Sequence, residues 1–174
     1  MLRHRLFPGD KGAIEMQRVL TLAMAGVFAL LVSTQAQAQT YSFTAALSGG
    51  NEIPAVSTGS AGTATVTLNA TTGVVTYRVD VYNMPVGTTA GHFHVGAAGV
   101  AGPTVINFTV STGISNDFAI TGTATSADLT LRAAQGIGSW EDFQQALLLG
   151  NMYINVHSTN NPGGEIRGQL VRVP

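Results

Sequence analysis

The chain has 174 residues, a formal net charge of −1 and no cysteine. The absence of cysteine excludes disulfide bonds, thiol nucleophiles and thiolate metal ligands. Only 10% of the residues are charged and the two signs nearly balance, which argues against nucleic acid or an anionic membrane surface as a partner.

The first 38 residues are typical of a secretory signal peptide. Arg18 precedes a 14-residue apolar run, Val19–Val32, which is followed by polar residues and the small-x-small site Ala36–Ala38. The run is short for a membrane span. We expect cleavage directly after this site, giving a periplasmic or secreted product that begins at Gln39 and has no membrane span. Met16 is an alternative translation start, and an anchor that is never cleaved is the alternative to a signal peptide.

Residues 39–174 are expected to form one domain. This part of the chain has seven acidic residues, four arginines and no lysine, so its net charge is −3. Its length is sufficient for a single packed core, which must supply the stability in the absence of disulfide bonds.

Most of this domain is predicted to be β-structure. Apolar and polar residues alternate with a period of two, and β-branched residues are frequent, as in strands with one buried face. The turn Thr71–Gly73 predicts a hairpin, whereas residues 128–134 fit either a helical turn or an edge strand. Without a βαβ rhythm, the pattern favours an all-β antiparallel Greek-key sandwich or barrel. The expected strands are 41–47, 62–68, 74–81, 89–95, 103–110, 118–125, 152–157 and 165–170.

One short helix is predicted near residues 140–149. Ser139 and Asp142 have the spacing of a capping box, and apolar residues then recur at roughly helical intervals. Trp140 and Phe143 are expected to anchor this helix in the core, across an open end of the sandwich.

Histidines are concentrated in two of the expected strands. On a strand, His92 and His94 project to the same face about 6.6 Å apart. His157 lies on the polar face of its own strand, opposite an apolar face. If the two strands lie close together, the three imidazoles form a site for one copper or zinc ion with an open position. The alternative is that they are ordinary surface or loop-bonded histidines.

Three further polar residues are candidates for functional contacts. The segment Ser158–Gly164 is rich in turn-forming residues and predicts a tight reversal with positive φ at a glycine. Glu165 and Arg167 follow on one face and are expected to pair with each other or with loop groups, and Arg167 is also a candidate contact for an anion near the metal. Glu52, in a loop beside a proline, fits a partner contact, a cation ligand or a turn cap.

Several motifs, taken in order, resemble the CHRD domain, the module named after chordin, which also occurs singly in many exported bacterial proteins. The resemblance covers about residues 41–171 and implies the module more firmly than any activity. Its motifs are Leu47–Pro54, Gly62–Val66, Ala90–Gly96, Gly102–Pro103 and Tyr153–Leu170.

A fainter likeness is to the Cu/Zn superoxide dismutases, which are Greek-key sandwiches. It implies that His92, His94 and His157 are copper ligands and that Arg167 guides an anionic substrate. No histidine lies between His94 and His157, so the metal-bridging ligand and the zinc cluster of those enzymes are missing, as is their cysteine pair.

These observations lead to three hypotheses. The first is an exported CHRD-domain binding module that holds one copper or zinc ion, for metal handling or for recognition of an unidentified extracytoplasmic protein. The second is a copper-dependent redox enzyme with dismutase-like chemistry. The third is a metal-free structural or adhesion module.

Overall fold

The computed structural model describes residues 39–85 and 87–174, so the predicted signal peptide and its alternative start lie outside the described residues. The described part contains strands, one α-helix and three short 3₁₀ helices. In chain order they are β1 (Thr40–Ser48), η2 (Gly49–Asn51), β2 (Ala61–Asn69), β3 (Val75–Met84), β4 (Thr88–Val95), β5 (Thr104–Asn107), β6 (Asn116–Ala124), η3 (Ser126–Asp128), η4 (Ala133–Gln135), α2 (Trp140–Leu148), β7 (Met152–Ser158), β8 (Ile166–Gln169) and β9 (Val171–Arg172).

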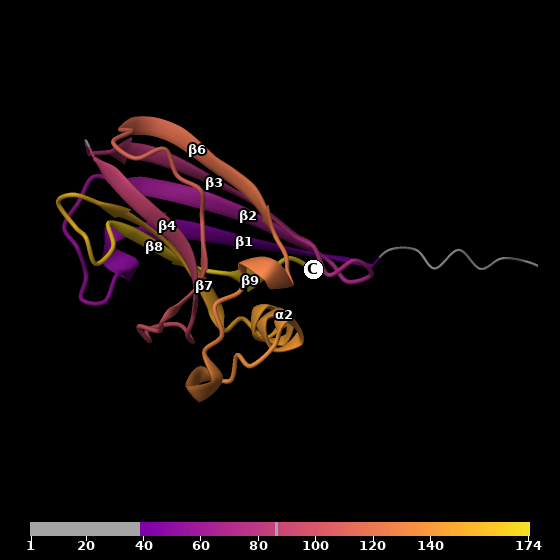
Figure 1. Ribbon diagram of the computed structural model, residues 1–174. Coiled ribbons are helices and arrows are strands. Elements are labelled where there is room, and N and C mark those ends of the chain that lie inside the picture. Colours follow the sequence, from indigo (N-terminus) through magenta and orange to yellow (C-terminus); the bar gives the residue numbers. More distant parts are fainter. Residues whose placement is uncertain (1–38, 86) are drawn as a thin grey trace, which may run out of the picture. The chain divides into compact units, whose positions relative to one another are not determined.

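The strands form one curled antiparallel sheet in the order β5-β4-β7-β8-β1-β2-β3-β6, with β9 paired to β1. Strands β1, β2, β3 and β6 run side by side in Figure 1. The links from β3 to β4 and from β5 to β6 cross between the two halves of the sheet, as in a Greek key. The all-β antiparallel architecture expected from the sequence is confirmed.

The core lies where the two halves of the sheet face each other. Tyr77 on β3 meets Phe93 on β4 with ring centroids 5.5 Å apart and also stacks on Phe108 at 4.3 Å. Phe143 from α2 reaches the same cluster through Phe93. Because aromatic side chains bury large areas, these contacts fix how the two halves pack.

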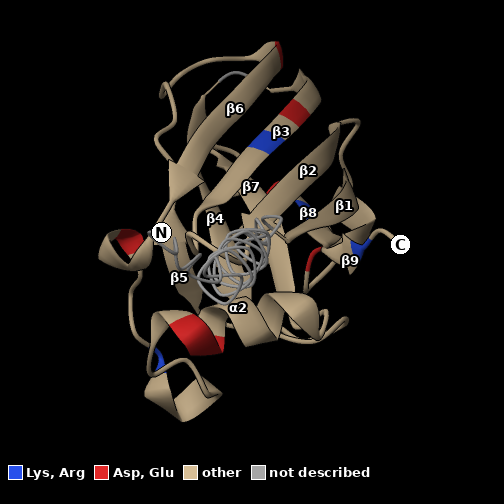
Figure 2. Cartoon of the chain, turned by 90° about the vertical axis from the view of Figure 1, so that its right-hand side faces the viewer, with Lys and Arg blue, Asp and Glu red and all other residues tan. Residues whose placement is uncertain are grey.

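Helix α2 closes one end of the curled sheet (Figure 2). Ser139 caps it by accepting a hydrogen bond from the Asp142 amide, and Phe143 is fully buried, as expected. The Asp142 carboxylate accepts from the Gly138 amide instead of returning to Ser139, so the capping box is only half formed. Trp140 is buried and donates to the Gly73 carbonyl oxygen at 2.9 Å, which fastens the helix to the β2–β3 turn.

Two expected elements differ from the structure. The strand expected over 103–110 ends at Asn107, because Phe108 turns inward onto Tyr77 and its amide bonds to Gly91. Residues 128–134 form neither a continuous helical turn nor an edge strand. They include the last residue of the 3₁₀ turn η3 and the first two of the 3₁₀ turn η4, and Arg132 between these turns forms an isolated bridge with Ile137.

Charged residues are sparse over this domain (Figure 2). No helix in residues 39–85 and 87–174 is long and apolar enough to cross a membrane.

Candidate metal centre

Strands β4 and β7 are direct neighbours, and their register brings the three histidines together. Ala90 is opposite His157, and His94 is opposite Tyr153. Phe93 between the two β4 histidines is fully buried in the core, so His92 and His94 project from the other face of the sheet. The shared face and the strand contact expected from the sequence are both confirmed.

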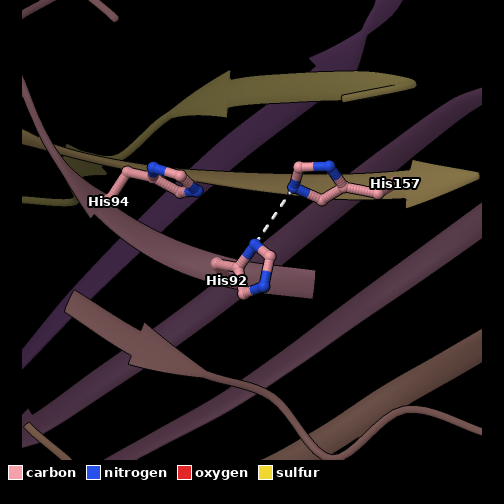
Figure 3. Close-up of side chains that lie close together, drawn as sticks. All are labelled: His92, His94 and His157. Atoms are coloured by element: carbon pink, nitrogen blue, oxygen red, sulfur yellow. Dashed lines mark hydrogen bonds between the residues drawn. The ribbon is translucent and has the colours of Figure 1, made fainter. Parts of the chain in front are cut away.

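The imidazole nitrogens lie close enough to hold one ion. His92 Nδ1 is 3.0 Å from His157 Nε2 (Figure 3). One nitrogen from each of the three rings lies within 4.8 Å of the others. Two nitrogens bound about 2.0 to 2.1 Å from one ion are at most about 4.2 Å apart, so capture requires at most a small inward rotation of one ring.

Backbone carbonyl oxygens orient two of the three rings. His94 Nδ1 is 2.9 Å from the Gly102 oxygen, and His157 Nδ1 is 2.9 Å from the Pro162 oxygen. A carbonyl oxygen can only accept, so each Nδ1 must donate its hydrogen, which leaves Nε2 as the unprotonated nitrogen of both rings. Metal-binding histidines are commonly fixed in this way, with the second ring nitrogen donating to a carbonyl or carboxylate.

All three imidazoles are held in the neutral form that binds metal. The pKa of His92 is lowered to about 4, chiefly by burial and also by the neighbouring His157 and His94, against a hydrogen bond with Asn155. Burial also lowers the pKa of His94 and of His157, although hydrogen bonds to Gly102 and Pro162 oppose this. Near neutral pH no imidazolium has to be deprotonated before a cation binds, and only the Nδ1 hydrogen that His92 donates to His157 must move to its other ring nitrogen.

Two polar neighbours of the histidines were not assigned a role from the sequence. The Asn155 side-chain oxygen is 2.9 Å from His157 Nε2, and the Thr104 hydroxyl is 3.3 Å from His94 Nε2. The Asn155 amide can fix the ring of His157 by donating to it or place an oxygen beside a bound ion. Asn155 lies on β7 two residues before His157, so strand periodicity places both side chains on one face, and this spacing could have identified Asn155 from the sequence.

The His94 ring packs against a stack formed by Tyr153 and Arg167. Tyr153 lies parallel to the His94 ring at 4.8 Å, and the guanidinium carbon of Arg167 is 3.5 Å from the Tyr153 ring centroid. Arg167 donates to the Val100 oxygen at 2.8 Å, and the Tyr153 hydroxyl donates to the Gly102 oxygen at 3.0 Å. The loop after β4 is thus tied over the stack.

Arg167 is engaged in this stack and is only 3% exposed. The position favours the predicted loop contact for Arg167. It does not present the guanidinium to an anion approaching from solvent, which is what the anion-guide role requires.

The structure shows no salt bridge between Glu165 and Arg167 among the described residues, and Glu165 instead has the loop partners that were the other alternative. Burial acts to raise the pKa of Glu165, but hydrogen bonds to the carboxylate outweigh it and lower the pKa below 4.5. The hydrogen bonds of Glu165 go to loop groups, as the sequence allowed. Gly164, which precedes Glu165, has the predicted positive φ, 141°. The donors are Thr58, Ser60, Ser158 and Asn161.

Glu52 is also nearly buried, at 8% exposed, and its Oε1 has no hydrogen-bond partner among the described residues. Its backbone amide bonds to Gly49 and closes the 3₁₀ turn η2. The turn therefore uses the backbone of Glu52 and leaves the carboxyl group unused, so the predicted turn cap is not made by the side chain.

Together the fold and the site define an all-β antiparallel domain with three convergent imidazoles beneath two loops. The CHRD domain model matches residues 43–170, and the chain belongs to the CHRD domain family. Comparison with curated proteins and with solved structures finds no similar protein.

Proposed function

We propose that this chain is an exported binding module whose CHRD domain holds one copper or zinc ion through His92 Nδ1, His94 Nε2 and His157 Nε2. The observation that best supports metal binding is the pair of backbone carbonyls that fix Nδ1–H on His94 and His157. A histidine with only a structural role has no need to direct its free lone pair toward two other imidazoles. Export rests on the signal-like sequence of residues 1–38.

The donor set favours copper or zinc over other ions. Three neutral imidazoles suit both metals, whereas calcium and magnesium require oxygen ligands. His92 is the least buried of the three rings, so the ion is accessible from its side. An accessible position suits metal handling or a metal-dependent contact with an extracytoplasmic protein.

The test is metal binding by the purified protein. We expect one zinc or copper ion per chain in elemental analysis and calorimetric titration. Copper should also show nitrogen couplings from three imidazoles in electron paramagnetic resonance. His94→Ala should reduce the affinity at least tenfold, because it removes one of three ligands. Tyr82→Ala is the matched control, since Tyr82 is an exposed ring on β3.

A result without stoichiometric metal, or equal affinity in His94→Ala, would contradict the metal proposal and leave the metal-free structural or adhesion module. Superoxide removal by the copper-loaded protein tests the redox alternative. The buried and engaged position of Arg167 does not favour that alternative.

A further inference from the structure

A second site is centred on Glu52, outside the histidine cluster. Oε1 of the Glu52 carboxyl group is enclosed and receives no hydrogen bond from the described residues. Burial raises its pKa to about 7; Glu165 also raises the pKa, and Arg167 lowers it. A buried carboxyl group without a donor is unfavourable and is expected to have a partner that the isolated domain does not supply.

This carboxyl group forms part of the wall of a hollow of about 190 Å³ between the loop after η2 and the loop after β7. Four apolar residues line the hollow beside Glu52, and Asn160, Asn161 and Gly163 complete its wall; the apolar residues are Ile53, Pro54, Val56 and Pro162. Gly164 also lines it, and a Cβ at that position would collide with the Glu52 carboxylate. Because glycine has no side chain, residue 164 leaves room for the Glu52 carboxyl group.

Apolar walls beside a single carboxylate match an aliphatic chain that ends in an ammonium group. A guanidinium prefers two accessible oxygens for a bidentate contact, and Oε1 of Glu52 is enclosed. A divalent cation of the calcium type requires six to eight oxygen ligands, and the side chains of an apolar hollow cannot supply them. Lysine, with a flexible apolar stem and a compact charge, fits both features.

The domain cannot fill this site itself. Residues 39–174 contain no lysine. Its four arginines are engaged elsewhere: Arg78 with Asp80, Arg132 with the Thr104 carbonyl, Arg167 with Val100 and Tyr153, and Arg172 with the Tyr41 ring. Residues 39–174 therefore supply no lysine ammonium group for this site.

We propose that the hollow beside Glu52 binds a lysine side chain of a partner polypeptide. The stem packs against Pro54, Val56 and Pro162, and the ammonium group meets the Glu52 carboxylate. Arg167 and Glu165 are the other charged groups that act on Glu52, and both remain in their own hydrogen-bond networks. The hollow shares Pro162 with the histidine cluster, because the Pro162 carbonyl oxygen accepts from His157, but its occupant is tested without a metal.

The probe is a blocked Gly-Lys-Gly peptide, titrated into the purified protein and followed by NMR shifts of residues 52–56 and 160–164. We expect a Kd on the order of 1 mM. The affinity should fall at least tenfold for the Nε-acetylated peptide and for Glu52→Gln. The matched control Glu141→Gln removes an exposed carboxylate on α2 and should leave the affinity unchanged. Binding should be several-fold tighter near pH 8 than near pH 6, because the amine requires ionised Glu52.

Glu52→Gln is nearly isosteric and removes a charge that burial disfavours, so it should fold, which thermal unfolding verifies. Equal binding by the acetylated peptide, or unchanged affinity in Glu52→Gln, would overturn the site. If calcium shifts the same resonances and the peptide does not, the lysine occupant is overturned.

Discussion

Glu52 and Glu165 are both almost completely buried, but their environments shift the pKa in opposite directions. Glu165 receives hydrogen bonds from two serines, a threonine and an asparagine, which hold its pKa below the ordinary value despite burial. Oε1 of Glu52 receives none, and burial raises the pKa of Glu52 to about 7. The hydrogen-bond donors around each carboxyl group, more than the degree of burial, therefore decide its charge.

Replacing Glu52 should change how stability depends on pH. The folded pKa of about 7 lies above the unfolded value of 4.5. Below about pH 4.5 the carboxyl group is neutral in both the folded and the unfolded chain, and burying it carries no charge penalty. The free energy of unfolding falls as pH rises through 7, because the buried group must then ionise. Glu52→Gln should gain stability relative to the wild type between pH 5 and 8, measured by urea unfolding. Curves that stay parallel over this range, as we expect for Glu141→Gln, would contradict the assigned pKa.

At the scale of elements, the candidate metal centre depends on one strand pair and two loops. The faces of His92, His94 and His157 follow from the period of two along a strand, so the sequence was sufficient to predict them. The contact between β4 and β7 follows from a chain crossing that local patterns do not encode, and only the family likeness suggested it. The carbonyls of Gly102 and Pro162 could not be predicted, because every residue has a carbonyl and its direction depends on the loop conformation.

The loop after β4 should tune metal affinity through Tyr153. The Tyr153 hydroxyl donates to the Gly102 oxygen and accepts from the Gly102 amide, and the same oxygen receives His94 Nδ1–H. Tyr153→Phe removes both hydroxyl bonds and keeps the ring stack. We expect a loss in zinc or copper affinity of roughly tenfold, as for other groups that orient metal ligands. Calorimetry against Tyr82→Phe is the comparison, and equal affinities would show that the loop holds His94 without the hydroxyl.

Helix caps show why local signals identify an element better than its detailed contacts. Ser139 and Asp142 predicted the start of α2 correctly, but the reciprocal capping box forms at Thr125 and Asp128 instead. Asp142 turns to the amide of Gly138, one residue outside the cap. The same residue spacing supports either bond, and the path of the incoming chain decides between them.

Removal of the Ser139 cap should therefore destabilise the domain locally. Ser139→Ala leaves the Asp142 amide without its acceptor and should cost about 1 kcal/mol, with a fall in Tm of a few degrees. Ser139→Asp, which retains a capping oxygen, should restore most of this loss. Metal affinity should stay unchanged in both variants because the bond is confined to the helix terminus. A Tm equal to that of the wild type in Ser139→Ala would mean that tertiary contacts alone hold the helix.

On the scale of the whole molecule, β7 is buried along its entire length, so the sheet has a buried layer on each side of this strand. One layer is the apolar core around Phe93 and Phe143, and the other contains the histidines, Asn155 and Tyr153 beneath their loops. The apolar layer stabilises the fold without any ligand. In the polar layer, neutral imidazoles whose lone pairs converge gain a favourable partner when a cation binds.

Metal binding should accordingly stabilise the folded domain in a pH-dependent way. Zinc at 100 times its Kd should add about 2.7 kcal/mol to the free energy of unfolding and raise the Tm by roughly 10 °C. Without metal, the folded pKa of His92, about 4, lies below its unfolded value of 6.5. Protons therefore favour the unfolded chain, and stability is lost as pH falls from 6.5 through 4. The same protons compete with the ion, so the zinc-dependent rise in Tm should shrink toward pH 5. Differential scanning calorimetry with and without a chelator measures both effects. A rise in Tm that persists in His94→Ala would place the ion elsewhere in the molecule.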